Sequence, residues 1–196
     1  EGDKIAIYYA SGDIVQDPKA ATMFGNNNYI ASRKVCKDLE DLMNDDDVKA
    51  VVVRINSGGG DAYASEQMWH QMSELRKVKP VVVSMGDYAA SGAYYMSVPA
   101  SWIVAQPNTL TGSIGIFAVI PDLSGLVTTK LGVRFDEVKT NRNSTFGNLM
   151  ARPFNAEEKA MLQASVNRGY SLFRQRVADG RRLPVESVEK IAQGRV

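Results

Sequence analysis

The sequence predicts an α/β fold with mostly parallel strands, because strand-like and helix-like segments alternate along its length. Residues 48–55 and 80–85 are short apolar runs typical of buried strands, and we expect burial on both faces of the first. Between such runs, Val35, Leu39 and Leu42 recur at i, i+4 and i+7, which places them on one face of a helix. Helices that connect parallel strands cross over one face of the sheet.

The remaining elements follow from the same periodicities. We expect further strands at residues 4–10, 102–105, 116–120 and 133–139. We expect helices at residues 30–43, 64–75, 123–131 and 162–177, and a short last one that Pro184 starts and Gly194 ends. The polar residues 25–28 are typical of a surface loop.

Composition limits the classes of function. A chain of 196 residues suits one domain, and its 23 basic and 22 acidic side chains create no net field that would favour nucleic acid. The single cysteine, Cys36, excludes an internal disulfide and a cysteine-rich metal site, and we expect neither metal nor cofactor. No apolar run approaches the roughly 18 to 20 residues that span a bilayer, so we expect the chain itself to be soluble.

A glycine-rich turn follows the first buried strand and enters a helix. In INSGGGDA, glycines let backbone N–H groups approach a ligand without side-chain obstruction. Such donors suit the oxyanion of an acyl-transfer reaction, although a flexible structural turn would look similar. A phosphate loop is disfavoured, because neither its glycine-lysine spacing nor the dinucleotide fingerprint is present.

A serine stands at the corresponding place after the next strand. In SMGDYAASGAYYMS, Ser91 comes at the start of a predicted helix whose positive end favours a developing anion. Small neighbours such as Ala90 and Ala93 are also compatible with simple close packing. The pair of turns, about 30 residues apart after successive strands, favours a nucleophile with its oxyanion donors.

Three blocks in this order, INSGGGDAYASE, VVVSMGDYAASGAYYMS and NTLTGSIGIF, resemble signal peptide peptidase A, also called protease IV. The resemblance continues through GYSLFRQRVADGR to KIAQGRV. It implies a Clp-protease/crotonase-like fold with repeated strand-strand-helix units, and it implies that Ser91 is the nucleophile. Gly92 and the Gly59-Gly60 turn would then form the oxyanion hole. The family usually has proline where Gly58 stands, which loosens the turn without removing a donor.

The general base is the point at which the sequence departs from the short members of the family. They resemble Ser/Lys dyad enzymes whose lysine follows the serine by a little over 50 residues, but no lysine lies between Thr140 and Phe154. Lys139 is a weak candidate within a predicted strand. His70, the only histidine, precedes Ser91 and is expected at the surface.

The longer family members take the lysine from a first repeat and the serine from a second. By this resemblance residues 1–196 form a single serine-peptidase repeat, the C-terminal catalytic half of a longer chain, with little activity alone. The implied partners are signal peptides and other repeats or copies. The implied location is the outer face of a bacterial cytoplasmic membrane, through an anchor outside this chain. A non-catalytic scaffold repeat and a crotonase-type acyl-CoA enzyme are the alternatives.

Overall fold

The computed structural model describes residues 2–17 and 28–196, which form two compact units. The first unit contains the described residues up to Ile116 together with Tyr170–Val196, and the second is Phe117–Gly169. Of the loop predicted at residues 25–28, all but Asn28 lies outside the described residues.

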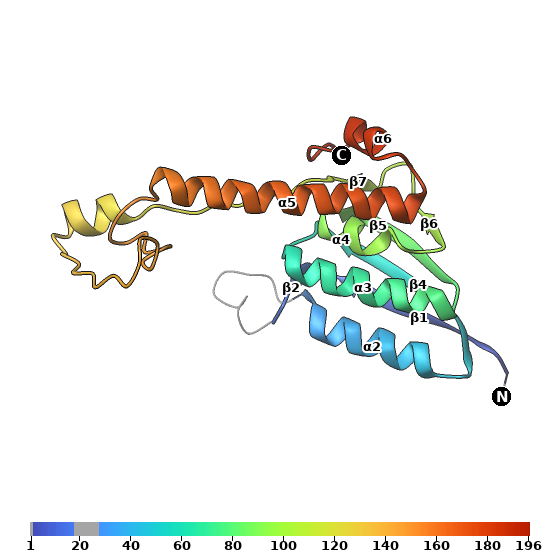
Figure 1. The fold of residues 1–196 in the computed structure, drawn as a ribbon. Helices are drawn as coiled ribbons and strands as arrows, with labels where there is room; N and C mark the ends of the chain where they lie inside the picture. Colours follow the sequence, from blue (N-terminus) through green and yellow to red (C-terminus); the bar gives the residue numbers. More distant parts are fainter. Residues whose placement is uncertain (1, 18–27) are drawn as a thin grey trace. The chain divides into compact units, whose positions relative to one another are not determined.

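A parallel sheet forms the centre of the first unit (Figure 1). Its strands are β1 (Lys4–Ser11), β4 (Val48–Ser57), β5 (Val81–Ala90), β6 (Trp102–Val104) and β7 (Leu110–Gly112). They run in the order β1-β4-β5-β6, and β7 pairs with the last residues of β5, beyond β6. The short strands β2 (Asp13–Val15) and β3 (Tyr29–Ala31) make a separate parallel pair.

Two helices lie side by side over one face of this sheet, α2 (Ser32–Asn44) and α3 (Ala62–Val78) (Figure 1). Valines and an isoleucine from alternate positions of β4, among them Val53 and Ile55, are fully buried beneath them. Met68 and Met72 of α3 complete this core. The parallel α/β fold predicted from the sequence is therefore confirmed.

The opposite face of the sheet has no such cover among the described residues. Ile7 and Tyr9 of β1 and Trp102 of β6 are more than half exposed, and Arg54 and Asn56 of β4 are exposed as well. The expectation that residues 48–55 are buried on both faces is thus wrong. Arg54 is exposed and lies between buried Val53 and Ile55. Its charge in the sequence was a sign that one face of this strand is open to solvent.

The C-terminal helices build a second core against the short helix α4 (Gly92–Ser97). Helix α5 (Ala156–Arg181) begins in the second unit and ends in the first, and α6 (Val185–Ile191) follows it, with Pro184 as its N-cap. Phe173 and Val177 of α5 and Val188 of α6 are buried together with Tyr95 of α4. This core fixes the helix that follows Ser91.

The second unit has less regular structure than the sequence predicted. Residues 125–130 form a π-helix (Gly125–Lys130) within the helix expected at 123–131. The strands expected at residues 116–120 and 133–139 are not formed, because these segments find no partner strand for their backbone groups. The strand that does form in this part of the sequence, β7 (Leu110–Gly112), precedes residues 116–120 and was not predicted. No helix of the described residues has the length and apolar character needed to cross a membrane.

Candidate active site

The glycine turn between β4 and α3 is held by backbone hydrogen bonds to Ile14. The Ile14 N–H donates to the Gly59 carbonyl at 3.0 Å, and the Ile14 carbonyl accepts from the Asp61 N–H at 2.9 Å. Asp61 caps α3 by accepting a hydrogen bond from the Ala64 N–H at 2.7 Å. The Gly60 N–H, between the two bonded residues, has no acceptor among the described residues.

The Gly59 N–H is already engaged inside the turn. It donates to the hydroxyl oxygen of Ser57 at 3.1 Å. The resemblance implied that this turn supplies one donor of the oxyanion hole, and among the described residues the Gly60 N–H is the one without an acceptor. The Ser57 side chain was not anticipated from the sequence, because a serine beside glycines is typical of any turn.

Ser91 stands between β5 and α4 in a backbone conformation that is unusual for a residue with a side chain. Its φ is 52° and its ψ is −120°. The Ser91 N–H donates to the Gly112 carbonyl of β7 at 2.9 Å, and its carbonyl accepts from the Tyr95 N–H at 2.8 Å. These contacts on both sides hold a conformation that is otherwise disfavoured by about 1–3 kcal/mol. Such strain is found most often at functional sites.

The structure brings the two turns together. A Cβ atom on Gly59 would stand 2.7 Å from the Gly92 backbone nitrogen and 2.8 Å from the Ser91 Cβ atom. Gly92 is the first residue of α4, so its N–H has no acceptor within the helix. The Gly60 nitrogen is also near, at 3.4 Å from where a Cβ on Gly92 would lie. Ser91 thus lies close to the backbone nitrogens of Gly60 and Gly92, and acyl-transfer chemistry needs a nucleophile and N–H donors in such proximity.

Ser65 is a neighbour of this point that the sequence did not reveal. It is 1% exposed, and its hydroxyl donates to the Asp61 carbonyl at 2.8 Å. A Cβ atom on Gly92 would collide with the Ser65 hydroxyl oxygen, so the small residue at position 92 permits the close approach of α4 to α3. The contact between Ser65 and Gly92 depends on how closely α3 and α4 pack, and no local sequence pattern predicts that distance.

No base accompanies Ser91 in the described part of the first unit. Its hydroxyl has no hydrogen bond there from a lysine or histidine, and His70 is exposed on α3. The lysines nearest in sequence are engaged elsewhere: Lys77 pairs with Glu74 at 2.6 Å, and Lys79 donates to the Leu42 and Asp45 carbonyls. Lys139 belongs to the second unit, outside any strand, where its ammonium pairs with Glu137 at 2.8 Å.

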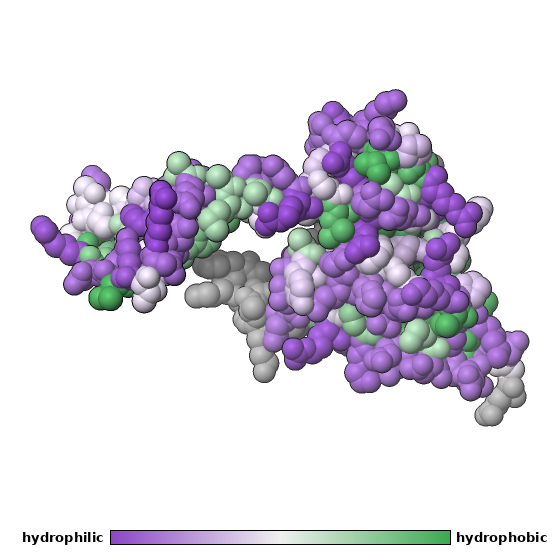
Figure 2. Space-filling view, in the orientation of Figure 1, coloured by the Kyte–Doolittle hydropathy of each residue, from purple (hydrophilic) through white to green (hydrophobic). Residues whose placement is uncertain are grey.

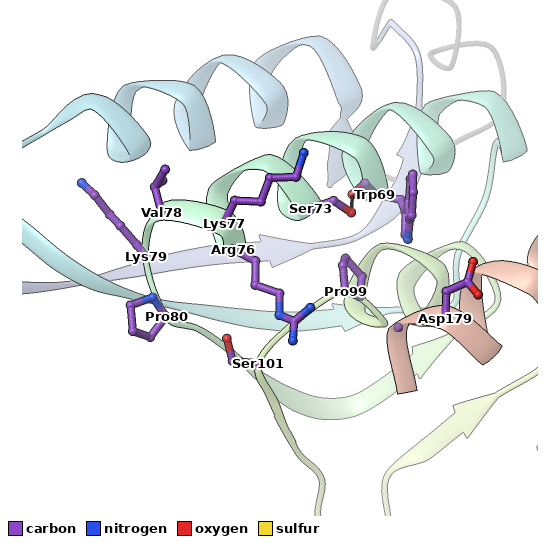
Figure 3. A pocket seen from close by; sticks show the side chains of 11 residues that line it. Trp69, Ser73, Arg76, Lys77, Val78, Lys79, Pro80, Pro99, Ser101 and Asp179 are labelled. Atoms are coloured by element: carbon purple, nitrogen blue, oxygen red, sulfur yellow. Dashed lines mark hydrogen bonds between the residues drawn. The ribbon is translucent and has the colours of Figure 1, made fainter. Parts of the chain in front are cut away.

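A hollow of about 720 Å³ lies at the other end of α3, away from the glycine turn. Figure 3 shows Trp69 and Arg76 of α3 on one side of it, with Pro80, Pro99 and Asp179 around it. Ser91 does not line this hollow.

Comparison with solved structures defines the class of fold. ClpP1 in a mutant form from Listeria monocytogenes superposes with a TM-score of 0.54 over 95% of this chain and 77% of that one, at 13% identity. The fold is thus that of the Clp proteases, as the resemblance implied.

The family is shown by sequence. Residues 73–196 match the model of peptidase family S49, and the chain belongs to this family. It is 39% identical to Protease 4 of Salmonella typhi over all of its residues, and 36% identical to the chloroplastic serine protease SPPA of Arabidopsis thaliana over 99% of them. It spans only 30% and 28% of those two proteins. The chain is thus a member of peptidase family S49 that matches part of relatives named Protease 4 and serine protease SPPA.

Proposed function

We propose that this chain is the serine-bearing repeat of a signal peptide peptidase, with Ser91 as its nucleophile. The observation that supports this most is the meeting of Ser91 with the free N–H groups of Gly60 and Gly92. Membership of a peptidase family supports the reaction class, and the unusual backbone conformation at Ser91 supports the choice of this residue.

In the proposed reaction the Ser91 hydroxyl oxygen attacks the carbonyl carbon of a peptide bond. A base takes the serine proton and returns it to the leaving amine, which departs as the acyl-enzyme forms. The carbonyl oxygen becomes negatively charged in the tetrahedral state, and in this proposal the Gly60 and Gly92 N–H groups donate to it, which the proximity of their nitrogens supports. Water then releases the acyl group by the same sequence of steps. Gly59 shapes the turn, with its own N–H held by Ser57.

We propose that the base is a lysine supplied by a preceding repeat of the same protein. The described part of the first unit offers no lysine at Ser91, and Lys139 is paired with Glu137 in the second unit. An apolar cleft lowers the pKa of a lysine and so leaves it neutral enough to accept the proton. The chain spans less than a third of Protease 4, which leaves room for such a repeat in relatives of that length.

We propose that neighbouring copies or repeats complete the cleft. Ile5, Ile7, Tyr9 and Trp102 are all more than half exposed in the first unit. In the second unit Phe117 and Val138 are more than four-fifths exposed, and hydrophobic residues appear in green among the polar ones on its surface in Figure 2. Apolar exposure of this extent on two units favours association. The proposed substrates are signal peptides left in a bacterial cytoplasmic membrane, with the site on its outer face.

The test uses the full-length parent protein and its Ser91→Ala variant. We expect the parent to hydrolyse an apolar signal-peptide substrate and the variant to lose roughly 10⁴-fold or more in kcat. Full activity in the Ser91→Ala protein would refute the proposed function. Retention of a coenzyme A thioester by the parent, with no peptide hydrolysis, would instead favour an acyl-CoA enzyme.

A further inference from the structure

We propose that Glu66 is a positioning residue for the nucleophile, acting through Tyr95 and Arg176 to hold α4 in place. This inference rests on the proposed role of Ser91. It assigns a function to a charged cluster that lies behind the site, where α3, α4 and the end of α5 meet within the first unit.

The Glu66 carboxylate binds one partner with each of its oxygens. Its Oε1 accepts a hydrogen bond from Arg176 Nη2 at 2.6 Å, and its Oε2 accepts one from the Tyr95 hydroxyl. The three side chains come from three different helices, α3, α5 and α4. Hydrogen bonds to an ionised group are stronger than neutral ones, so this carboxylate ties the three helices together.

The surroundings keep the cluster ordered. Tyr95 is 5% exposed, and its ring centroid lies 4.6 Å from that of Phe173. The Arg176 guanidinium lies over the Trp69 ring, with Cζ 3.6 Å from its centroid. Burial, and then the hydrogen bond to Glu66, raise the pKa of the Tyr95 hydroxyl well above its ordinary value. Tyr95 therefore remains a neutral donor to Glu66.

Tyr95 lies one helical turn beyond Ser91. Its N–H donates to the Ser91 carbonyl at 2.8 Å, so the same residue holds Ser91 by its backbone and Glu66 by its side chain. Helix α4 has only six residues, Gly92–Ser97, and a helix this short depends on tertiary contacts for its stability. The strained φ of 52° at Ser91 likewise persists only where neighbouring contacts fix it.

Glu66 also follows directly after a residue of α3 that contacts the beginning of α4. Its neighbour Ser65 lies against Gly92, the residue that offers a donor N–H to the oxyanion. Consecutive residues of α3 thus contact the beginning of α4 and, through Tyr95, its second turn. A loosened Glu66–Tyr95 bond would let α4 rotate and would move the Ser91 hydroxyl relative to the Gly60 and Gly92 donors.

The test is Tyr95→Phe in the full-length parent, which removes the hydroxyl and keeps the ring on Phe173. We expect kcat and the rate of Ser91 labelling by a fluorophosphonate to fall about tenfold, with KM changed less than about twofold. The matched control is Tyr94→Phe on the same helix, because the Tyr94 hydroxyl has no hydrogen bond among the described residues. We expect the control to keep the parent's kcat and labelling rate.

Further variants test whether the carboxylate is the centre of the cluster. Glu66→Gln should lower the labelling rate as Tyr95→Phe does, and the double variant should be no slower than the slower single one. Arg176→Lys, which keeps the charge, should restore most of the rate that Arg176→Ala loses. If thermal melting shows that Tyr95→Phe does not fold, Arg176→Lys and Arg176→Ala are compared instead, and equal labelling rates of these two variants would contradict the proposal.

Two results overturn the proposal. One is a folded Tyr95→Phe protein with the parent's kcat and labelling rate, and the other is an equal loss in Tyr94→Phe. The activity of the Ser91→Ala protein distinguishes these outcomes from a failure of the proposed function. If the proposed function is wrong, Ser91→Ala keeps its activity, whatever the effect of Tyr95→Phe.

Discussion

Gly59 and Gly92 approach so closely that a single added carbon at position 59 would stand 2.7 Å from the Gly92 backbone nitrogen. This contact joins the end of β4 to the beginning of α4. Gly59 also has a φ of 101°, which residues with a side chain rarely adopt.

We therefore expect Gly59→Ala to lower the free energy of unfolding by about 1–3 kcal/mol and to suppress peptide hydrolysis, because the turn and Ser91 must move apart. Gly58 is the matched control. A Cβ atom there meets nothing within 4 Å, and Gly58→Ala should leave activity intact and stability within about 1 kcal/mol. Chemical denaturation with activity assays measures both, and equal behaviour of the two variants would contradict this view of the turn.

A second prediction separates chemistry from strain at position 91. Ser91→Ala and Ser91→Gly both remove the hydroxyl, so both should abolish hydrolysis. Glycine accepts a φ of 52° more readily than alanine, so Ser91→Gly should have the higher melting temperature of the two. Melting curves of the two inactive proteins make the comparison, and a more stable Ser91→Ala would show that the backbone at Ser91 is not strained.

The regular part of the fold was predictable because local periodicity carries it. The valine runs of β4 and β5 and the helical stripe of Met68 and Met72 are patterns within single elements. The missing strands at residues 116–120 and 133–139 had suitable composition, but a strand forms only where a partner is available, and sequence periodicity does not show the partner.

The elements of the candidate site were recognisable in the sequence for the same reason. The glycine turn and Ser91 were found from motifs, and the structure brings them together. The engagement of the Gly59 N–H by Ser57, the bond from Ser91 to Gly112 and the contact of Ser65 with Gly92 depend on how the elements pack. The Glu66–Tyr95–Arg176 cluster joins residues up to 110 positions apart, and no local pattern marks such a set.

A third prediction concerns the pH dependence of the second unit. Arg152 donates to both oxygens of Glu158 at 2.8 Å, and this pairing, followed by the Asn155 N–H, lowers the pKa of Glu158 from 4.5 to about 2. A carboxyl group whose pKa is lower in the folded state than in the unfolded state stabilises the folded state at pH values above the unfolded-state pKa. This stabilisation should be complete above about pH 4.5 and should be lost as the pH falls towards about 2.

Hydrogen exchange at the first turns of α5, recorded between pH 7 and pH 3, measures this effect. We expect protection there to fall on acidification, and Glu158→Gln to show weak protection already at pH 7. The control is Glu157→Gln, because Glu157 pairs with Arg142 at the surface. Equal protection of the Glu158→Gln protein and the parent at pH 7 would exclude a role for the ion pair in starting this helix.

A fourth prediction follows from the proposal that another repeat supplies the base, since no lysine or histidine among residues 2–17 and 28–196 bonds to the Ser91 hydroxyl. Residues 1–196 alone should then hydrolyse peptides very slowly, because the backbone donors can act without a base to take the proton. Lys139→Ala should leave the activity of the full-length parent unchanged, since Lys139 pairs with Glu137. Replacing the lysine of the preceding repeat that is proposed as the general base should abolish the activity of the parent. A complete loss in Lys139→Ala, with the fold intact by circular dichroism, would show that this chain carries its own dyad.

The most direct test of the central claim is to map the residue that a fluorophosphonate modifies in the full-length parent. The nucleophile hypothesis predicts a single adduct on the peptide that contains Ser91, found by mass spectrometry, and no adduct in the Ser91→Ala protein. An adduct on another serine, or an unmodified Ser91 in a parent that hydrolyses peptides, would contradict it.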